Sequence, residues 1–288
     1  MRTLNFELKK MCERNKDGSF STQDNRQRIL SLIANQLHEL GYRNLKAGGL
    51  KPKHVQSLVE RWKIEGLSAG TRKNRMSHLR WWAQKVNKSS VIAKSNDNYD
   101  IERRVFVTNV SKAKVLDTEK LAVIDDAYIK VSLKLQAEFG LRKAECMKIN
   151  PSIADNGDHI SLKASWCKGG RARDVLIRND YQRESLNEAK MLSKKGSLIP
   201  TNLTYVEQKR IFEYQTAKAG IDNVHGLRHA YAQKRYFELT GRLAPAAGGK
   251  TSKELTRDEK QIDRIARLTI SEELGHEREQ ITAIYLGR

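Results

Sequence analysis

The spacing of apolar residues predicts three helices near the start of the chain. Residues 24–40 carry apolar side chains at helical intervals, and residues 52–65 form a second amphipathic stretch. A third stretch begins at Ser68 or Thr71, either of which can cap a helix. The pattern therefore indicates a helical N-terminal domain over residues 1–90.

The helical pattern then stops and resumes further along the chain. Residues 88–107 are polar and irregular, so we place a linker at residues 91–114 and a second domain at residues 115–288. A helix that Asp117 can cap opens this domain. Further helical patterns cover residues 181–193, 204–219, 226–240 and 256–274.

One segment of the second domain has the pattern of a β-hairpin. Residues 158–178 alternate between apolar and polar positions on both sides of a Gly169-Gly170 turn. Residues 241–252 are rich in Gly and small residues, and we interpret 241–264 as an insertion. The predicted fold class is therefore mainly α, with one small β-hairpin in the second domain.

The net charge of the chain indicates a binding partner. The chain has 54 Lys and Arg against 34 Asp and Glu, a net charge of +20, which favours a polyanion such as nucleic acid. Residues 67–96 hold seven Lys or Arg and no acid. We expect the polar face of the third helix to contact DNA through four of these residues: Arg72, Lys73, Arg75 and Arg80.

Several classes of protein do not fit the composition. Three scattered cysteines, Cys12, Cys146 and Cys167, are too few for a disulfide framework or a zinc site. The start of the chain lacks the apolar core of a signal peptide, and no segment approaches a membrane span. We therefore expect a cytoplasmic, nucleoid-associated protein without a membrane partner. No cluster has the spacing of metal ligands.

Four short motifs in the second domain carry the chemistry. In order they read GLRKAE, CKGGRARDVLI, HGLRHAYA and LGHEREQITAIYL. They supply Arg142 with Glu145, then Lys168, then His225 with Arg228, and finally His276 with Tyr285. Cations arranged around a tyrosine are the groups needed to break a phosphodiester bond through a covalent phosphotyrosine. Each residue alone is commonplace, but the ordered set is not.

This ordered set resembles the tyrosine recombinases of the phage integrase superfamily, over about residues 20–286. The resemblance implies a helical core-binding domain and a mostly helical catalytic domain that close as a C-shaped clamp around DNA. The 48-residue interval between Arg228 and His276 is longer than the family usually keeps, as in a prophage and genomic-island subgroup. Because the sequence ends three residues after Tyr285, we expect no C-terminal segment that packs on a neighbouring protomer.

The resemblance also assigns roles to the residues. Planar guanidinium groups fit phosphate oxygens well, so Arg142 and Arg228 are expected to clamp the phosphate. His276 is expected to donate a hydrogen bond to the same oxygens. Tyr285 is the nucleophile, His225 accepts its proton, Lys168 protonates the departing 5′-oxygen, and Glu145 orients a basic neighbour. No metal or other cofactor is required.

The implied activity is site-specific cutting and rejoining of DNA through a 3′-phosphotyrosine, which would integrate or excise a mobile element. Its partners would be double-stranded attachment sites, further copies of the chain in a tetramer, and DNA-bending or directionality factors. Two alternatives stay open: relaxation of DNA as in type IB topoisomerases, and a DNA-binding relative without chemistry. We interpret His159, His229 and Cys167 as ordinary structural residues, with a structural hydrogen bond for His229.

Overall fold

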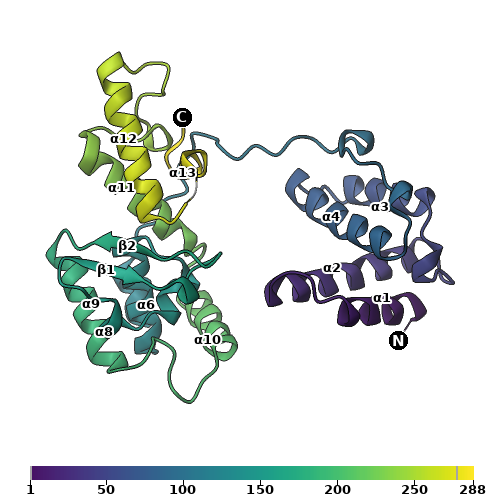
Figure 1. Cartoon of the computed structure of the whole chain (residues 1–288), viewed down its shortest axis with the longest axis horizontal. Helices are drawn as coiled ribbons and strands as arrows, with labels where there is room; N and C mark the ends of the chain where they lie inside the picture. The colour runs from purple at the N-terminus through teal and green to yellow at the C-terminus, as the bar shows by residue number, and fades with distance from the viewer. Residues whose placement is uncertain (1, 277) are drawn as a thin grey trace. The chain divides into compact units, whose positions relative to one another are not determined.

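The computed structural model describes residues 2–276 and 278–288 and divides the chain into two compact units. One unit extends to Val105, and the other runs from Phe106 to Arg288 (Figure 1). The described residues are mostly helical and contain a two-stranded sheet. This confirms the predicted class, a mainly helical chain with one small β-hairpin.

The first unit is built from four helices. These are α1 (Thr3–Arg14), α2 (Phe20–Glu39), α3 (Pro52–Ile64) and α4 (Ala69–Lys85). The patterns predicted α2, α3 and α4 but not α1. Helix α2 begins earlier than predicted because the Ser19 side chain caps it by accepting a hydrogen bond from the Thr22 amide.

Two buried tryptophans hold the centre of this unit. Trp62 of α3 and Trp82 of α4 are fully buried. The indole Nε1 of Trp62 donates to the Gln36 side chain at 2.9 Å, and that of Trp82 donates to the Ala47 carbonyl oxygen at 2.9 Å. Because a buried N–H without a partner is costly, these bonds let both rings fill the core.

The second unit surrounds helix α6 (Ala127–Phe139). Its other helices are α5 (Thr118–Val123), α7 (Lys143–Lys148), α8 (Pro151–Ala154), α9 (Asp180–Ser193), α10 (Tyr205–Lys218), α11 (His225–Thr240), α12 (Arg257–Glu273) and α13 (Glu279–Leu286). Helix α6 packs against α7, α9 and α11. Gly140 ends α6 with φ +61°, where a Cβ atom would lie 2.4 Å from Cδ1 of Tyr231. A glycine therefore permits the close approach of α6 and α11.

The predicted hairpin is present in this unit. Strands β1 (His159–Leu162) and β2 (Arg173–Leu176) pair antiparallel, with Leu162 opposite Arg173. Gly169 and Gly170 both have positive φ in the connecting turn. A glycine pair therefore reverses the chain directly after Lys168.

The start of α12 agrees with the helical pattern predicted over residues 256–274, while the insertion at 241–264 stays a prediction. Helix α12 begins at Arg257, so residues 257–264 form its first turns. Thr256 and Glu259 form a reciprocal capping box, which fixes the start of the helix there. Residues 241–256 remain outside regular helices except for a short 3₁₀ turn, Pro245–Ala247, which packs against α13.

Candidate active site

Separate segments of the second unit bring the predicted residues together. Arg142 caps the N-terminus of α7, and His225 and Arg228 lie in the first turn of α11. His276 directly follows the last turn of α12, and Tyr285 lies in α13. Residues 142, 225–228 and 276–285 are far apart in sequence but adjacent in the fold.

The Tyr285 hydroxyl group lies between a base and a cation. Its oxygen is 3.3 Å from Nε2 of His225, and Nε of Arg228 donates to it at 3.4 Å. A phenol can accept one hydrogen bond while donating another, so it can accept from Arg228 and donate to His225 at once. Tyr285 is only 6% exposed, so the two neighbours largely determine its surroundings.

Two further histidine rings pack on Tyr285. The His276 ring stacks on it with centroids 5.3 Å apart, and the His229 ring lies at 4.5 Å. The expected structural hydrogen bond of His229 is wrong for Nδ1, which is buried and has no hydrogen-bond partner among the described residues. His229 contacts the tyrosine because it lies four residues after His225, on the same face of α11.

Arg228 is buried and bound to the protein itself. It is 1% exposed, and its Nη groups donate to the carbonyl oxygens of Gly140 and Leu274 and, at 3.2 Å, to Nε2 of His276. Burial, followed by the charge of Arg142, lowers the pKa of Arg228 to about 10, so it is still charged at neutral pH. Four of its five N–H groups thus have partners within the protein, and the phosphate clamp expected of Arg228 stays a prediction.

Arg142 is the more accessible of the two arginines. Its side chain is 22% exposed, and its Nη1 donates to Oε1 of Glu145 at 2.7 Å. The Arg142 amide donates to the other oxygen of the same carboxylate at 2.8 Å. Glu145 therefore holds both the backbone and the side chain of Arg142, in keeping with the orienting role expected of it.

Sequence reasoning missed a second arginine on this carboxylate. Nη2 and Nη1 of Arg173, in β2, donate to Glu145 at 2.7 and 3.2 Å. Glu145 is fully buried, which by itself would raise its pKa, but Arg173 and then Arg142 lower that pKa to about 2. The signal was the inward position of Arg173 in an alternating strand, where an apolar residue is usual.

The histidines of the site are held neutral. Burial, then the charges of Arg228 and Arg142, lowers the pKa of His225 and lowers that of His276 to about 3. Neutral His225 can therefore accept a proton on Nε2 at physiological pH. Nε2 of His276 already faces an Arg228 N–H, so donation to a phosphate requires that contact to exchange.

Lys168 lies on the turn between β1 and β2, outside the cluster of side chains that contact Tyr285. Its side chain is exposed on the β1–β2 turn, directly after the buried Cys167. Nη1 of Arg173 contacts Sγ of Cys167 at 3.4 Å, which ties the base of the turn to Glu145. The fold thus anchors the turn beside the site and leaves the lysine tip accessible.

The four basic residues of α4 do not form one exposed face. Arg72 is buried and pairs with Glu102 at 3.2 Å, and Arg80 donates to the Ala93 carbonyl oxygen at 3.0 Å. Arg75 is mostly buried, with its guanidinium 5.4 Å from the Trp62 ring. Residues 93–102 fold back over Arg72 and Arg80, and Arg75 lies against Glu65 and Trp62, so the expected DNA contact through this face stays a prediction. Lys73 is half-buried.

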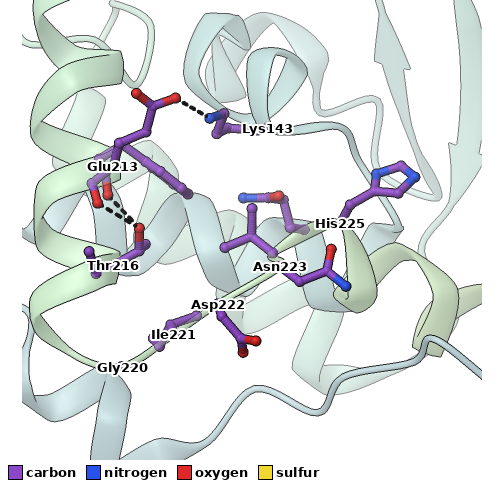
Figure 2. Close-up of a pocket in the computed structure, with 12 residues that line it drawn as sticks. Lys143, Glu213, Thr216, Gly220, Ile221, Asp222, Asn223 and His225 are labelled. Carbon is purple, nitrogen blue, oxygen red and sulfur yellow. Dashed lines mark hydrogen bonds and ion pairs between the residues drawn. The ribbon is translucent and has the colours of Figure 1, made fainter. Parts of the chain in front are cut away.

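A cavity adjoins the site on the side of α10. Figure 2 shows His225 at one end of it and Lys143 and Glu213 facing each other, with Nζ of Lys143 2.9 Å from Oε1 of Glu213. The cavity contains neither Tyr285 nor Arg228 in its lining. It therefore borders the reacting groups without enclosing them.

No group of His, Cys, Asp and Glu with the geometry of a metal site occurs within residues 2–276 and 278–288. The same residues include no helix long and apolar enough to cross a membrane.

Comparisons with solved structures identify proteins of similar fold. The chain is similar to a lambda integrase dimer bound to a core site, with 15% identity, 99% of this chain and 78% of that chain covered, and a TM-score of 0.62. It is also similar to XerH recombinase bound to its difH substrate (16% identity; 99% and 81% covered; TM-score 0.58). A third match is the Tn1549 transposon integrase in complex with circular intermediate DNA (13% identity; 100% of this chain and 96% of that chain covered; TM-score 0.56).

Family models match most of the chain in sequence. Residues 1–91 match the phage integrase N-terminal domain, and residues 103–234 match the integrase domain. No curated protein matches the chain. The two models match in the order in which integrases carry these domains, and the similar structures share the fold. The chain therefore belongs to the phage integrase family of tyrosine-type site-specific recombinases.

Proposed function

We propose that this recombinase cuts and rejoins DNA through a covalent 3′-phosphotyrosine on Tyr285, and that it integrates or excises a mobile element. The observation that carries the proposal is the position of the Tyr285 hydroxyl between Nε2 of His225 and Nε of Arg228. A free tyrosine has a pKa near 10, so attack at neutral pH needs such a base or cationic surroundings.

In the cleavage step the Tyr285 oxygen bonds to phosphorus while the bond from phosphorus to the 5′-oxygen breaks. The phenolic proton moves to Nε2 of His225, which its lowered pKa keeps unprotonated beforehand. Lys168 supplies a proton to the departing 5′-oxygen. Rejoining is the reverse reaction, in which a 5′-hydroxyl attacks the phosphotyrosine and restores the phenol.

Negative charge on the phosphate oxygens is met by fixed cations. Arg142 has the exposed guanidinium that can reach the phosphate, while Arg228 contributes its charge from a buried position. Charges that are already oriented need no rearrangement as the transition state forms, which makes them effective catalysts. Neutral His276 adds a hydrogen bond, not a charge, if its contact with Arg228 exchanges for a phosphate oxygen.

The proposed partner is double-stranded DNA carrying specific sites. The lambda integrase, XerH and Tn1549 integrase structures that this chain resembles all contain DNA, and the first of them is a dimer. Because two sites must exchange all four strands, we propose a tetramer on synapsed sites, in which both units of each chain contact DNA. DNA-bending and directionality factors would be accessory.

The test is a nicked suicide substrate made from the sequence that flanks the gene. Wild-type protein should become covalently joined to the 3′-phosphate, whereas Tyr285→Phe should bind the same DNA without forming the adduct. Tyr214→Phe changes an exposed tyrosine of α10 and is the matched control, which should react normally. An adduct that persists in Tyr285→Phe would refute the assignment, and relaxation of a plasmid without a site would favour a topoisomerase.

A further inference from the structure

Arg173 contacts three segments that each carry a residue of the proposed site. It is the first residue of β2, and its side chain is only 6% exposed. One contact reaches Arg142 through Glu145, one reaches the turn that carries Lys168, and one reaches the end of α12 before His276. No assigned step of the reaction uses Arg173.

The first contact is a buried ion pair with two hydrogen bonds. Nη2 and Nη1 of Arg173 donate to Oε2 and Oε1 of Glu145 at 2.7 and 3.2 Å. The same two oxygens accept from the backbone and the side chain of Arg142. Glu145 can therefore fix the orientation of Arg142 as long as Arg173 holds the carboxylate in place.

The other two contacts fix the segments on either side. Nη1 of Arg173 contacts Sγ of Cys167 at 3.4 Å, and Nε donates to the carbonyl oxygen of Glu273 at 2.8 Å. Gly275 lies against the same side chain, since a Cβ atom there would be 3.0 Å from Cδ and Nη1 of Arg173. One guanidinium group thus joins β2, the lysine turn and the segment before His276.

We propose that Arg173 is a positioning residue for strand cleavage. It fixes Arg142, the turn that carries Lys168 and the segment before His276 relative to one another. This inference rests on the proposed function. Arg173 acts through Glu145, Cys167 and the backbone after α12, and it does not touch the DNA. A displacement of about 1 Å in a catalytic group can cost on the order of 100-fold in rate, so its loss should appear in cleavage.

The role of Arg173 in holding Glu145 charged provides a specific signature. Burial opposes the Glu145 charge, and Arg173 is the strongest influence that favours it. The titratable and charged groups that interact with this carboxylate are Arg142, Arg173, Cys146, Cys167, Arg228 and His276. Without Arg173 the carboxyl should protonate at a higher pH, and it would then release its hold on Arg142.

The experiment compares Arg173→Met with wild-type protein in the suicide assay at saturating DNA. Adduct formation should slow on the order of 100-fold, with DNA affinity within about threefold of wild type, as expected when reacting groups are misplaced but phosphate contacts remain. The acid limb of the rate should move to higher pH in Arg173→Met. The added substitution Glu145→Gln should remove that displaced limb.

The matched control is Arg183→Met. Arg183 and Lys190 share the Asp155 carboxylate, each at 2.8 Å, so this change also removes one of two cations from a carboxylate. It should react within about twofold of wild type if the effect of Arg173 is specific to the site. An Arg173→Met rate equal to that of Arg183→Met, or an unshifted acid limb, would overturn the inference.

Arg173→Lys covers the case in which Arg173→Met does not fold. Lysine keeps the charge but replaces the two-pronged contact with a single ammonium, so roughly a tenfold loss of rate is expected. A rate within about twofold of wild type would contradict the inference. The proposed function is judged separately: no adduct with wild-type protein would refute that function, whereas equal adducts from wild type and Arg173→Met would refute only the role of Arg173.

Discussion

The hydroxyl oxygen of Tyr285 lies 3.3 Å from Nε2 of His225. The two atoms are at hydrogen-bonding distance, and a slight approach brings them within the range of direct proton transfer. The His225 ring reaches it from the N-terminus of α11, while the tyrosine comes from α13. Packing between the two helices therefore determines whether the proposed base and the proposed nucleophile meet.

Cleavage should depend on pH through His225. Burial, then Arg228 and Arg142, lowers its pKa below 6.5, so the neutral base is fully present above that pH. The rate should fall only when the pH drops through the lowered pKa. In single-turnover assays His225→Gln should slow adduct formation by about 100-fold or more and lose this acid limb. An acid limb that survives unchanged in His225→Gln would assign it to another group.

Lys168→Ala should be rescued by a better leaving group. Without the lysine, the 5′-oxygen must leave unprotonated, whereas a bridging 5′-phosphorothiolate leaves as a thiolate and needs no proton. Such a substrate should restore adduct formation in Lys168→Ala but not in Arg142→Ala. Lys163→Ala removes another exposed lysine of the hairpin and should behave as wild type. Failure of the sulfur substrate to rescue Lys168→Ala would remove Lys168 from the role of general acid.

His229 should make the second unit acid-sensitive. Burial, then the charges of His225, Lys112 and Arg228, lowers its pKa to about 4. Between pH 6.5 and 4 the unfolded chain binds a proton there and the folded chain does not, so stability falls with pH, by about 2 kcal/mol at pH 5. His229→Phe keeps a ring beside Tyr285 and should lose less stability between pH 7 and 5 in urea titrations. An equal loss in both proteins would contradict this.

DNA affinity should depend on Lys73 more simply than on its arginine neighbours. Arg72 and Arg80 bond within the first unit, so neutralising them should also lower stability. Lys73→Gln should reduce the slope of log affinity against log salt by about 1 if the lysine contacts a phosphate. Lys85→Gln removes the same charge from a lysine that pairs with Asp17 at 3.1 Å and is the control. Equal slopes for wild type and Lys73→Gln would exclude the contact.

Sequence reasoning went furthest where chemistry depends on residue type and order. Helical periodicity and the hairpin pattern predicted most elements, and three of the four motifs supplied residues that lie together in the fold, while Lys168 lies outside that cluster. It failed where a contact depends on a remote segment. Nothing in the α4 pattern indicates that residues 93–102 cover Arg72 and Arg80, and the inward position of Arg173 in β2 does not reveal that its partner is Glu145. The start of α12 could be predicted from the sequence, since Thr256 and Glu259 have the spacing of a capping box.

The placement of Tyr285 against Arg228 within one chain limits how copies can help each other. Both groups, and His225 with them, come from the same second unit. A copy that lacks the tyrosine hydroxyl and a copy that lacks Arg228 each keep a damaged centre, and mixing them restores neither. In a mixed assembly each defective copy therefore removes one active centre. Activity should fall in proportion to the fraction of defective copies, and two different defective variants should not complement each other.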